Sequence, residues 1–146
     1  MRLEFILEGM AAFGNPVLLE MKKLGILASG EDIPQAVPAL KPGWVWLSGF
    51  HSALEESVLK ATQAPAIRVA AVAAEQVGLS TAQLQRLADG RLLVLCPFAE
   101  PRTTRANALA RNRLVADRAN KLWIPAARPG GSLEKLRQEF RQKLMP

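Results

Sequence analysis

The chain has 146 residues, of which 49% are apolar and 22% are charged, and its formal net charge is +6. This is the size and balance of one globular domain, expected to span residues 1–146, and the chain is too short for two ordinary ones. No apolar run reaches the length of a membrane helix. Acids interrupt the apolar N-terminus, which does not resemble a signal peptide, so we expect a cytoplasmic location without membrane association.

The first half of the chain predicts two strands and one helix. An apolar run over 24–29 predicts the first strand. Three prolines between residues 34 and 42 then limit any helix to a turn or two, because proline breaks helices. A second strand is expected over 44–47. It is followed by a helix over 52–61, on which Glu55 belongs to the solvated side.

The second half repeats this alternation. Its apolar runs and capping residues predict a strand over 67–73, a helix over 80–89, a strand over 92–98, a helix from Thr103 or Thr104 to residue 120, a strand over 121–126 and a helix over 133–144.

Strands that alternate with helices from residue 24 onward are typical of a parallel sheet with helices on its faces. We therefore expect an α/β, Rossmann-like fold, with a mostly parallel sheet of about five strands and helices on both faces. Cys96 falls in a strand-like run and is expected to be a buried, reduced thiol.

Ligands of open α/β sheets gather at the carboxyl ends of the strands. The stretch Ser48-Gly49-Phe50-His51-Ser52 should lie there, between a strand and a helix. Glycine lets the backbone approach a phosphate, and Ser52 or His51 could donate a hydrogen bond to it. An ordinary strand-to-helix turn with a serine cap is an equally good interpretation.

A second glycine turn, Gly130-Gly131-Ser132, precedes the last predicted helix. Such a turn is a weak motif by itself. Two of them in one parallel sheet are more informative, because both helix starts would face the same edge.

The excess positive charge lies in one segment, which holds a single acid, Asp117. Its basic residues are Arg102, Arg105, Arg111, Arg113, Arg118, Lys121 and Arg128. Arginine suits bidentate contact with phosphate, so the segment favours an anionic partner, nucleic acid or a nucleotide, over a merely solvated helix face. Within it, Arg111-Asn112-Arg113 are the expected contact residues.

Motifs for chemistry are missing from the sequence. There is no Cys/His metal spacing, no nucleophile elbow, no Walker lysine and no dinucleotide fingerprint. We therefore predict no catalytic residue, no metal and no cofactor.

Taken together, the chain resembles the Rossmann-like domain of the DNA-processing protein A (DprA/Smf) family, and a small stand-alone bacterial branch of it best. The residues that carry the resemblance are Gly14-Asn15-Pro16, LGILASGEDIP, SGFHSALEESVL, CPF and ARNRLVADRANKLWIPAARPGGSLEKL. The resemblance implies that Ser48, Gly49, His51, Ser52, Arg111, Asn112 and Arg113 help to form a positively charged pocket for phosphate or single-stranded DNA. It also implies a link to DNA uptake or recombination, dimerisation through this domain and a RecA-type recombinase as partner.

PGGSLEKL suggests an alternative, because it is similar to a loop of the lysine-decarboxylase-like (LOG) phosphoribohydrolases, which cleave nucleoside monophosphates. That resemblance implies a phosphate cradle at Gly130, Gly131 and Ser132, with Glu134 as the catalytic acid and Arg111 assisting. A nucleotide-sensing domain is the third hypothesis.

Overall fold

The computed structural model describes residues 2–28 and 37–145. Within them, seven strands form one sheet in the order β1-β2-β6-β5-β4-β3-β7. The strands are β1 (Phe5–Leu7), β2 (Met10–Gly14), β3 (Lys22–Ile26), β4 (Trp44–Ser48), β5 (Ala66–Val69), β6 (Leu92–Cys96) and β7 (Lys121–Trp123). The pairs among β3, β4, β5, β6 and β7 are all parallel, which confirms the predicted five-stranded parallel core.

The N-terminal hairpin was not predicted. β1 and β2 pair antiparallel, and β2 pairs antiparallel with β6, so this hairpin extends the parallel sheet at one edge. Glu8 and Gly9, between the two strands, both have positive φ (51° and 81°), as a two-residue type I′ turn requires.

The described residues also form four α-helices and three short 3-10 helices. The α-helices are α1 (Ala53–Ala61), α2 (Thr81–Ala88), α3 (Arg105–Arg118) and α4 (Ser132–Glu139), and the 3-10 helices are η1 (Pro16–Glu20), η2 (Ala74–Gln76) and η3 (Arg141–Lys143). Serine or threonine side chains cap α1, α2 and α3 as predicted, each accepting the N–H three residues on. The expected last helix stops at Glu139 and continues only as η3.

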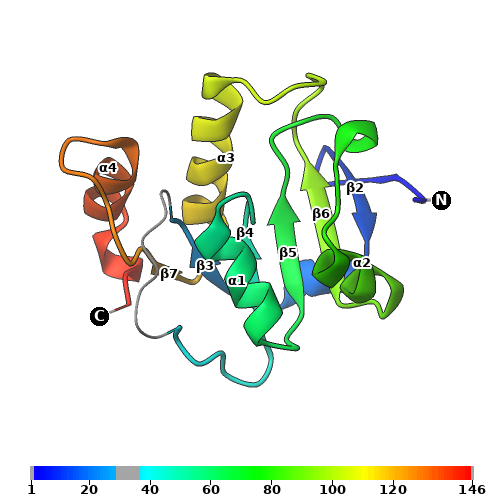
Figure 1. The fold of residues 1–146 in the computed structure, drawn as a ribbon, viewed down its shortest axis with the longest axis horizontal. Helices are drawn as coiled ribbons and strands as arrows, with labels where there is room; N and C mark the ends of the chain where they lie inside the picture. Colours follow the sequence, from blue (N-terminus) through cyan, green and yellow to red (C-terminus); the bar gives the residue numbers. More distant parts are fainter. Residues whose placement is uncertain (1, 29–36, 146) are drawn as a thin grey trace.

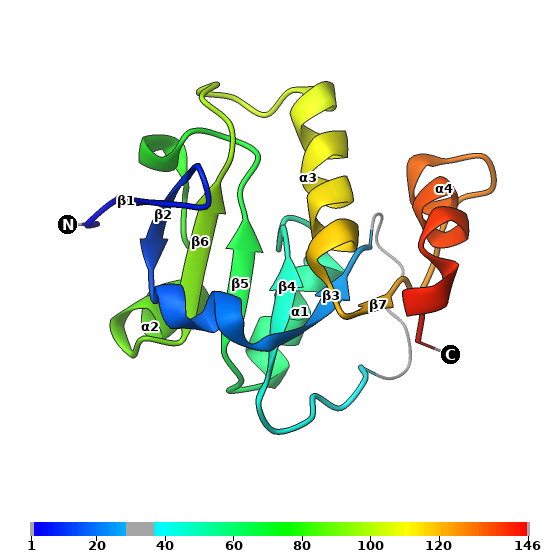
Figure 2. The same ribbon diagram turned by 180° about the vertical axis from the view of Figure 1, so that it is seen from behind.

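The helices cover both faces of the sheet, as expected (Figures 1 and 2). On one face, Leu54 and Val58 of α1 pack with Trp46 of β4. On the other face, Val115 and Ala116 of α3 pack against the sheet. Alternate side chains of the buried strands therefore enter two separate apolar layers.

The chain reverses its order along the sheet beside β3. β3 leads to β4, β5 and β6 in turn, whereas α3 then brings the chain back to β7 on the opposite side of β3. Such a reversal places the ligand site of an open α/β sheet at the carboxyl ends of the neighbouring strands. No helix of the described residues is long and apolar enough to cross a membrane.

Candidate functional site

The turn over 48–52 joins the carboxyl end of β4 to the start of α1. The hydroxyl of buried Ser48 accepts the Phe50 N–H at 3.2 Å, and the hydroxyl of Ser52 accepts the Glu55 N–H at 3.2 Å. Phe50 has a φ of 48° and a side chain only 4% exposed, packed in the core beneath the turn. The turn is thus anchored from below, while His51 remains exposed.

Glu55 is buried at this turn, so the prediction that its side chain lies on the solvated face of the helix is wrong. Its side chain is 0% exposed. One carboxylate oxygen accepts the backbone N–H of His51 at 3.1 Å and lies 2.9 Å from its Nδ1, and the other accepts the Ala28 N–H at 3.0 Å. The carboxylate therefore ties the chain just after β3 to the start of α1.

Arg111 reaches the same turn from α3, on the opposite face of the sheet. Its Nη2 lies 3.2 Å from His51 Nε2, and its Nε donates to Asn112 Oδ1 at 3.2 Å. A Cβ added to Gly49 would lie 2.8 Å from both Cδ and Nε of Arg111. Gly49 is therefore required for this close approach, because any larger residue would push the arginine away.

The Arg111 guanidinium is held in a partly dehydrated position. The residue is only 5% exposed, and no carboxylate of the described residues forms an ion pair with it. Burial lowers the pKa of Arg111 below its ordinary value, and the charge of Glu55 opposes that effect. A bound anion would relieve the cost of keeping this charge out of water.

Arg68 adds a second positive charge at this edge. It is the register partner of Ser48 on β5. Burial lowers its pKa, the charge of Glu56 opposes that effect, and the charge of Arg111 adds to it to a smaller extent. Arg68 donates to Gly78 O at 2.5 Å and to Gln83 Oε1 at 2.8 Å. Arg68 was not predicted as a site residue, because it lies on β5, outside the basic segment between Arg102 and Arg128.

Asn107 lies one helical turn before Arg111, on the same side of α3. It is 7% exposed, and its Nδ2 has no hydrogen-bond partner among the described residues. The start of α3 lies at the carboxyl edge of the sheet (Figure 2). This buried amide donor was missed from the sequence, although its spacing of four residues from Arg111 is a usable signal.

Arg113 points elsewhere, so the predicted Arg111-Asn112-Arg113 group is divided. Arg113 forms a two-pronged ion pair with Glu139 and lies 5.7 Å from the Phe140 ring centroid. It thus joins α3 to α4. The structure brings Arg111 to the turn over 48–52, with Asn112 bonded to its Nε, and places Arg113 against α4.

The second glycine turn lies just before α4. Gly130 has a φ of 76°, and the Gly131 N–H donates to Arg128 O at 2.9 Å, which closes the turn on itself. Gly131 is the N-cap residue and no side chain caps this helix, so Ser132 is the first residue of α4 rather than part of the turn before it. Glu134 lies half-buried in the first turn of α4, and no described hydrogen bond or ion pair joins it to Arg111.

The described residues offer no set of metal ligands. Among residues 2–28 and 37–145, no group of three or more His, Cys, Asp or Glu side chains could hold a metal ion. Cys96 is buried as predicted, and burial raises its pKa to about 11, so it is not an activated nucleophile.

No protein-family model matches this chain, and no curated protein matches it. Among solved structures, it is similar to DNA processing protein A (DprA) of Helicobacter pylori, with a TM-score of 0.72 and 18% identity over 99% of this chain and 78% of that one. It is also similar to DprA of Streptococcus pneumoniae, with a TM-score of 0.65 and 16% identity over 93% of this chain and 55% of that one. The chain has a DprA-like fold, and it spans only about half the length of the second protein.

Proposed function

We propose that this chain binds single-stranded nucleic acid, DNA in the first place, by its phosphates and without changing it chemically. The observation that carries the proposal is the buried guanidinium of Arg111. It lies against Gly49 at the carboxyl edge of the sheet and has no carboxylate partner among the described residues. Arginine offers a fork of donors that fits a phosphate.

The surroundings of Arg111 suit an anion that arrives from solvent. His51 is exposed beside it, and the unpartnered amide of Asn107 lies one helical turn away. Among the described residues, Glu55 is the carboxylate that contacts the turn, and its oxygens are bonded to backbone N–H groups and His51. The Arg111 guanidinium and the unpartnered Asn107 amide thus supply a positive charge and a free donor, which a phosphate requires.

A chain of phosphates fits better than one. Arg102 and Arg105 are exposed at the start of α3, beyond Arg111, and form no ion pair with the described acids. Cations spread along one helix can contact successive phosphates of an extended strand. The structurally similar Helicobacter pylori protein binds single-stranded DNA.

The test is a titration of labelled oligo-dT, followed by fluorescence anisotropy at two salt concentrations and with mononucleotides as competitors. We expect affinity to fall steeply with salt, because phosphate contacts release counterions. Mononucleotides should not displace the strand. Displacement by one of them would replace this proposal with a small-nucleotide site, and absence of any binding would refute both.

Two arginine variants locate the site. Arg111→Ala is expected to weaken oligo-dT binding about tenfold and to reduce the salt slope by about one unit. Arg113→Ala removes the same charge from the same helix, but its guanidinium is engaged with Glu139. It should leave affinity within about twofold. Equal losses in both variants would show that only overall charge matters.

A further inference from the structure

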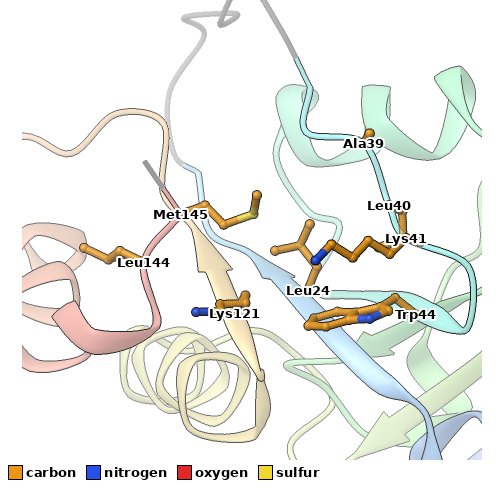
Figure 3. Close-up of a pocket in the computed structure, with 8 residues that line it drawn as sticks. All are labelled: Leu24, Ala39, Leu40, Lys41, Trp44, Lys121, Leu144 and Met145. Carbon is orange, nitrogen blue, oxygen red and sulfur yellow. The ribbon is translucent and has the colours of Figure 1, made fainter.

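A cavity of about 200 Å³, shown in Figure 3, lies on the α1 face of the sheet. It lies at the opposite end of β4 from the Arg111 site. Trp44 is the first residue of β4 and Ser48 the last, so the length of that strand separates the two places. Leu24 of β3 and Lys121 of β7 are register partners and line the same cavity. Its chemistry therefore belongs to neither phosphate turn.

The interior of the cavity is apolar. Leu24, Leu40 and Trp44 line it on the side of β3 and β4, and Met145 lines it on the side of β7. An apolar cavity of roughly 150 Å³ is sufficient for a benzene ring. This one thus has room for a single large apolar or aromatic side chain, and both an indole and a thioether favour aromatic neighbours.

Lysines surround this apolar interior. Lys41 and Lys121 line the cavity, and the Nζ of Lys22 lies 5.8 Å from the centroid of the Trp44 ring. All three are exposed, and none forms an ion pair with a carboxylate of the described residues. Three positive charges around one apolar cavity are more than a single monoanion would neutralise.

The polar groups of the cavity favour a carboxylate over a nucleobase as the occupant. The lysine ammonium groups and the indole N–H of Trp44 are donors, and among the described lining residues no side chain offers an oxygen acceptor. A base edge carries N–H groups, for which these side chains supply no oxygen acceptor. Carboxylates, which only accept, match this set.

We propose that this cavity docks an acidic peptide segment of a partner protein, which inserts one aromatic side chain between Trp44 and Met145. Aspartates or glutamates on either side of that anchor lie among Lys22, Lys41 and Lys121. An apolar anchor in a pocket surrounded by complementary charges is a common arrangement in peptide recognition. The site is independent of the Arg111 site and extends the proposed function to a protein partner.

The test uses the full chain and a fluorescein-labelled octapeptide that carries one phenylalanine among aspartates and glutamates. We expect saturable binding by anisotropy. A peptide with alanine in place of the phenylalanine should bind at least about tenfold more weakly, because the aromatic side chain supplies the anchor. Excess oligo-dT should not displace the peptide. Displacement by oligo-dT, or equal binding of the alanine peptide, would overturn the proposal.

Lysine variants provide a second test. Because the lysines are exposed, replacing them should not unfold the protein. The double variant Lys41→Gln and Lys121→Gln is expected to weaken peptide binding about tenfold and to leave oligo-dT binding within about twofold. The matched control, Lys60→Gln with Lys135→Gln, also removes two exposed charges but none at the cavity. It should bind the peptide like the parent, and an equal loss in the control would refute the site.

Discussion

Glu55 holds His51 by both its backbone and its ring: one carboxylate oxygen accepts the His51 N–H at 3.1 Å and lies 2.9 Å from Nδ1. In neutral His51 this contact assigns the proton to Nδ1, so Nε2 is the acceptor that faces Arg111 at 3.2 Å. A buried acid thus orients an exposed histidine, which in turn contacts the arginine proposed to bind phosphate.

This relationship predicts the effect of Glu55→Gln. The amide would turn an N–H₂ donor toward one of the backbone N–H groups that the carboxylate now accepts. We expect a loss of about 2 kcal/mol in the free energy of unfolding, measured by urea denaturation, because bonds to a buried charge are replaced by a donor–donor conflict. Glu75→Gln, at an exposed position, is the control and should be neutral. Equal stability of the two variants would contradict the assigned role of Glu55.

The close approach of Gly49 and Arg111 predicts a binding defect without unfolding. Gly49→Ala would place its Cβ 2.8 Å from the Arg111 side chain, so the guanidinium must move. Oligo-dT affinity should fall about tenfold in the anisotropy assay, which corresponds to roughly 1.4 kcal/mol. Gly78→Ala is a matched control, since its Cβ would meet no atom within 4 Å. A Gly49→Ala protein that binds like the control would show that Arg111 is not placed for binding by this contact.

Part of this architecture was predictable because local signals and packing agree. Ser52, Ser80 and Thr104 each begin a helix where hydroxyl capping and apolar periodicity coincide, and all three caps are observed. The β1–β2 hairpin was missed for a physical reason. β1 has only three residues, and its pairing depends on contacts with β2 and on a turn formed by Glu8 and Gly9, a weaker signal than Asn-Gly.

The turns of the site could be predicted from the sequence, whereas the contacts between distant residues of the site could not. The sequence placed Gly49 and Arg111 in functional stretches, but no local pattern tells that Arg111 crosses the sheet edge while Arg113 turns to α4. Glu55 could have been found. Ser52 and Glu55 have the spacing of a capping box, in which the acid bends back to the start of the helix. Here it accepts the N–H of His51, one residue before the cap.

Phe50 predicts an unusual order of stability among its variants. Its φ of 48° strains any residue with a Cβ by roughly 1 kcal/mol, and glycine escapes that strain. Both Phe50→Ala and Phe50→Gly lose the buried ring, yet Phe50→Gly should be the more stable by about 1 kcal/mol in urea denaturation.

The control for this comparison is Phe13, a buried residue of β2 with an ordinary φ. There the order should reverse, since glycine in a strand loses more conformational entropy than alanine. If alanine is better than glycine at both positions, the left-handed conformation of Phe50 does not carry the strain assigned to it.

The reaction rate of the Cys96 thiol tests whether the end of β6 is buried. Burial raises its pKa from the ordinary 9.0 to about 11, so the neutral thiol is favoured in the fold. Near pH 8 the thiolate population should be about 100-fold lower than in the unfolded chain, and a disulfide reagent should react slower by at least that factor. Because the folded pKa is the higher one, this contribution to stability is complete below pH 9 and is lost as the pH rises toward 11. Reaction of the native protein at the rate measured in urea would mean that the carboxyl end of β6 opens readily, since Cys96 is only 3% exposed in the closed fold.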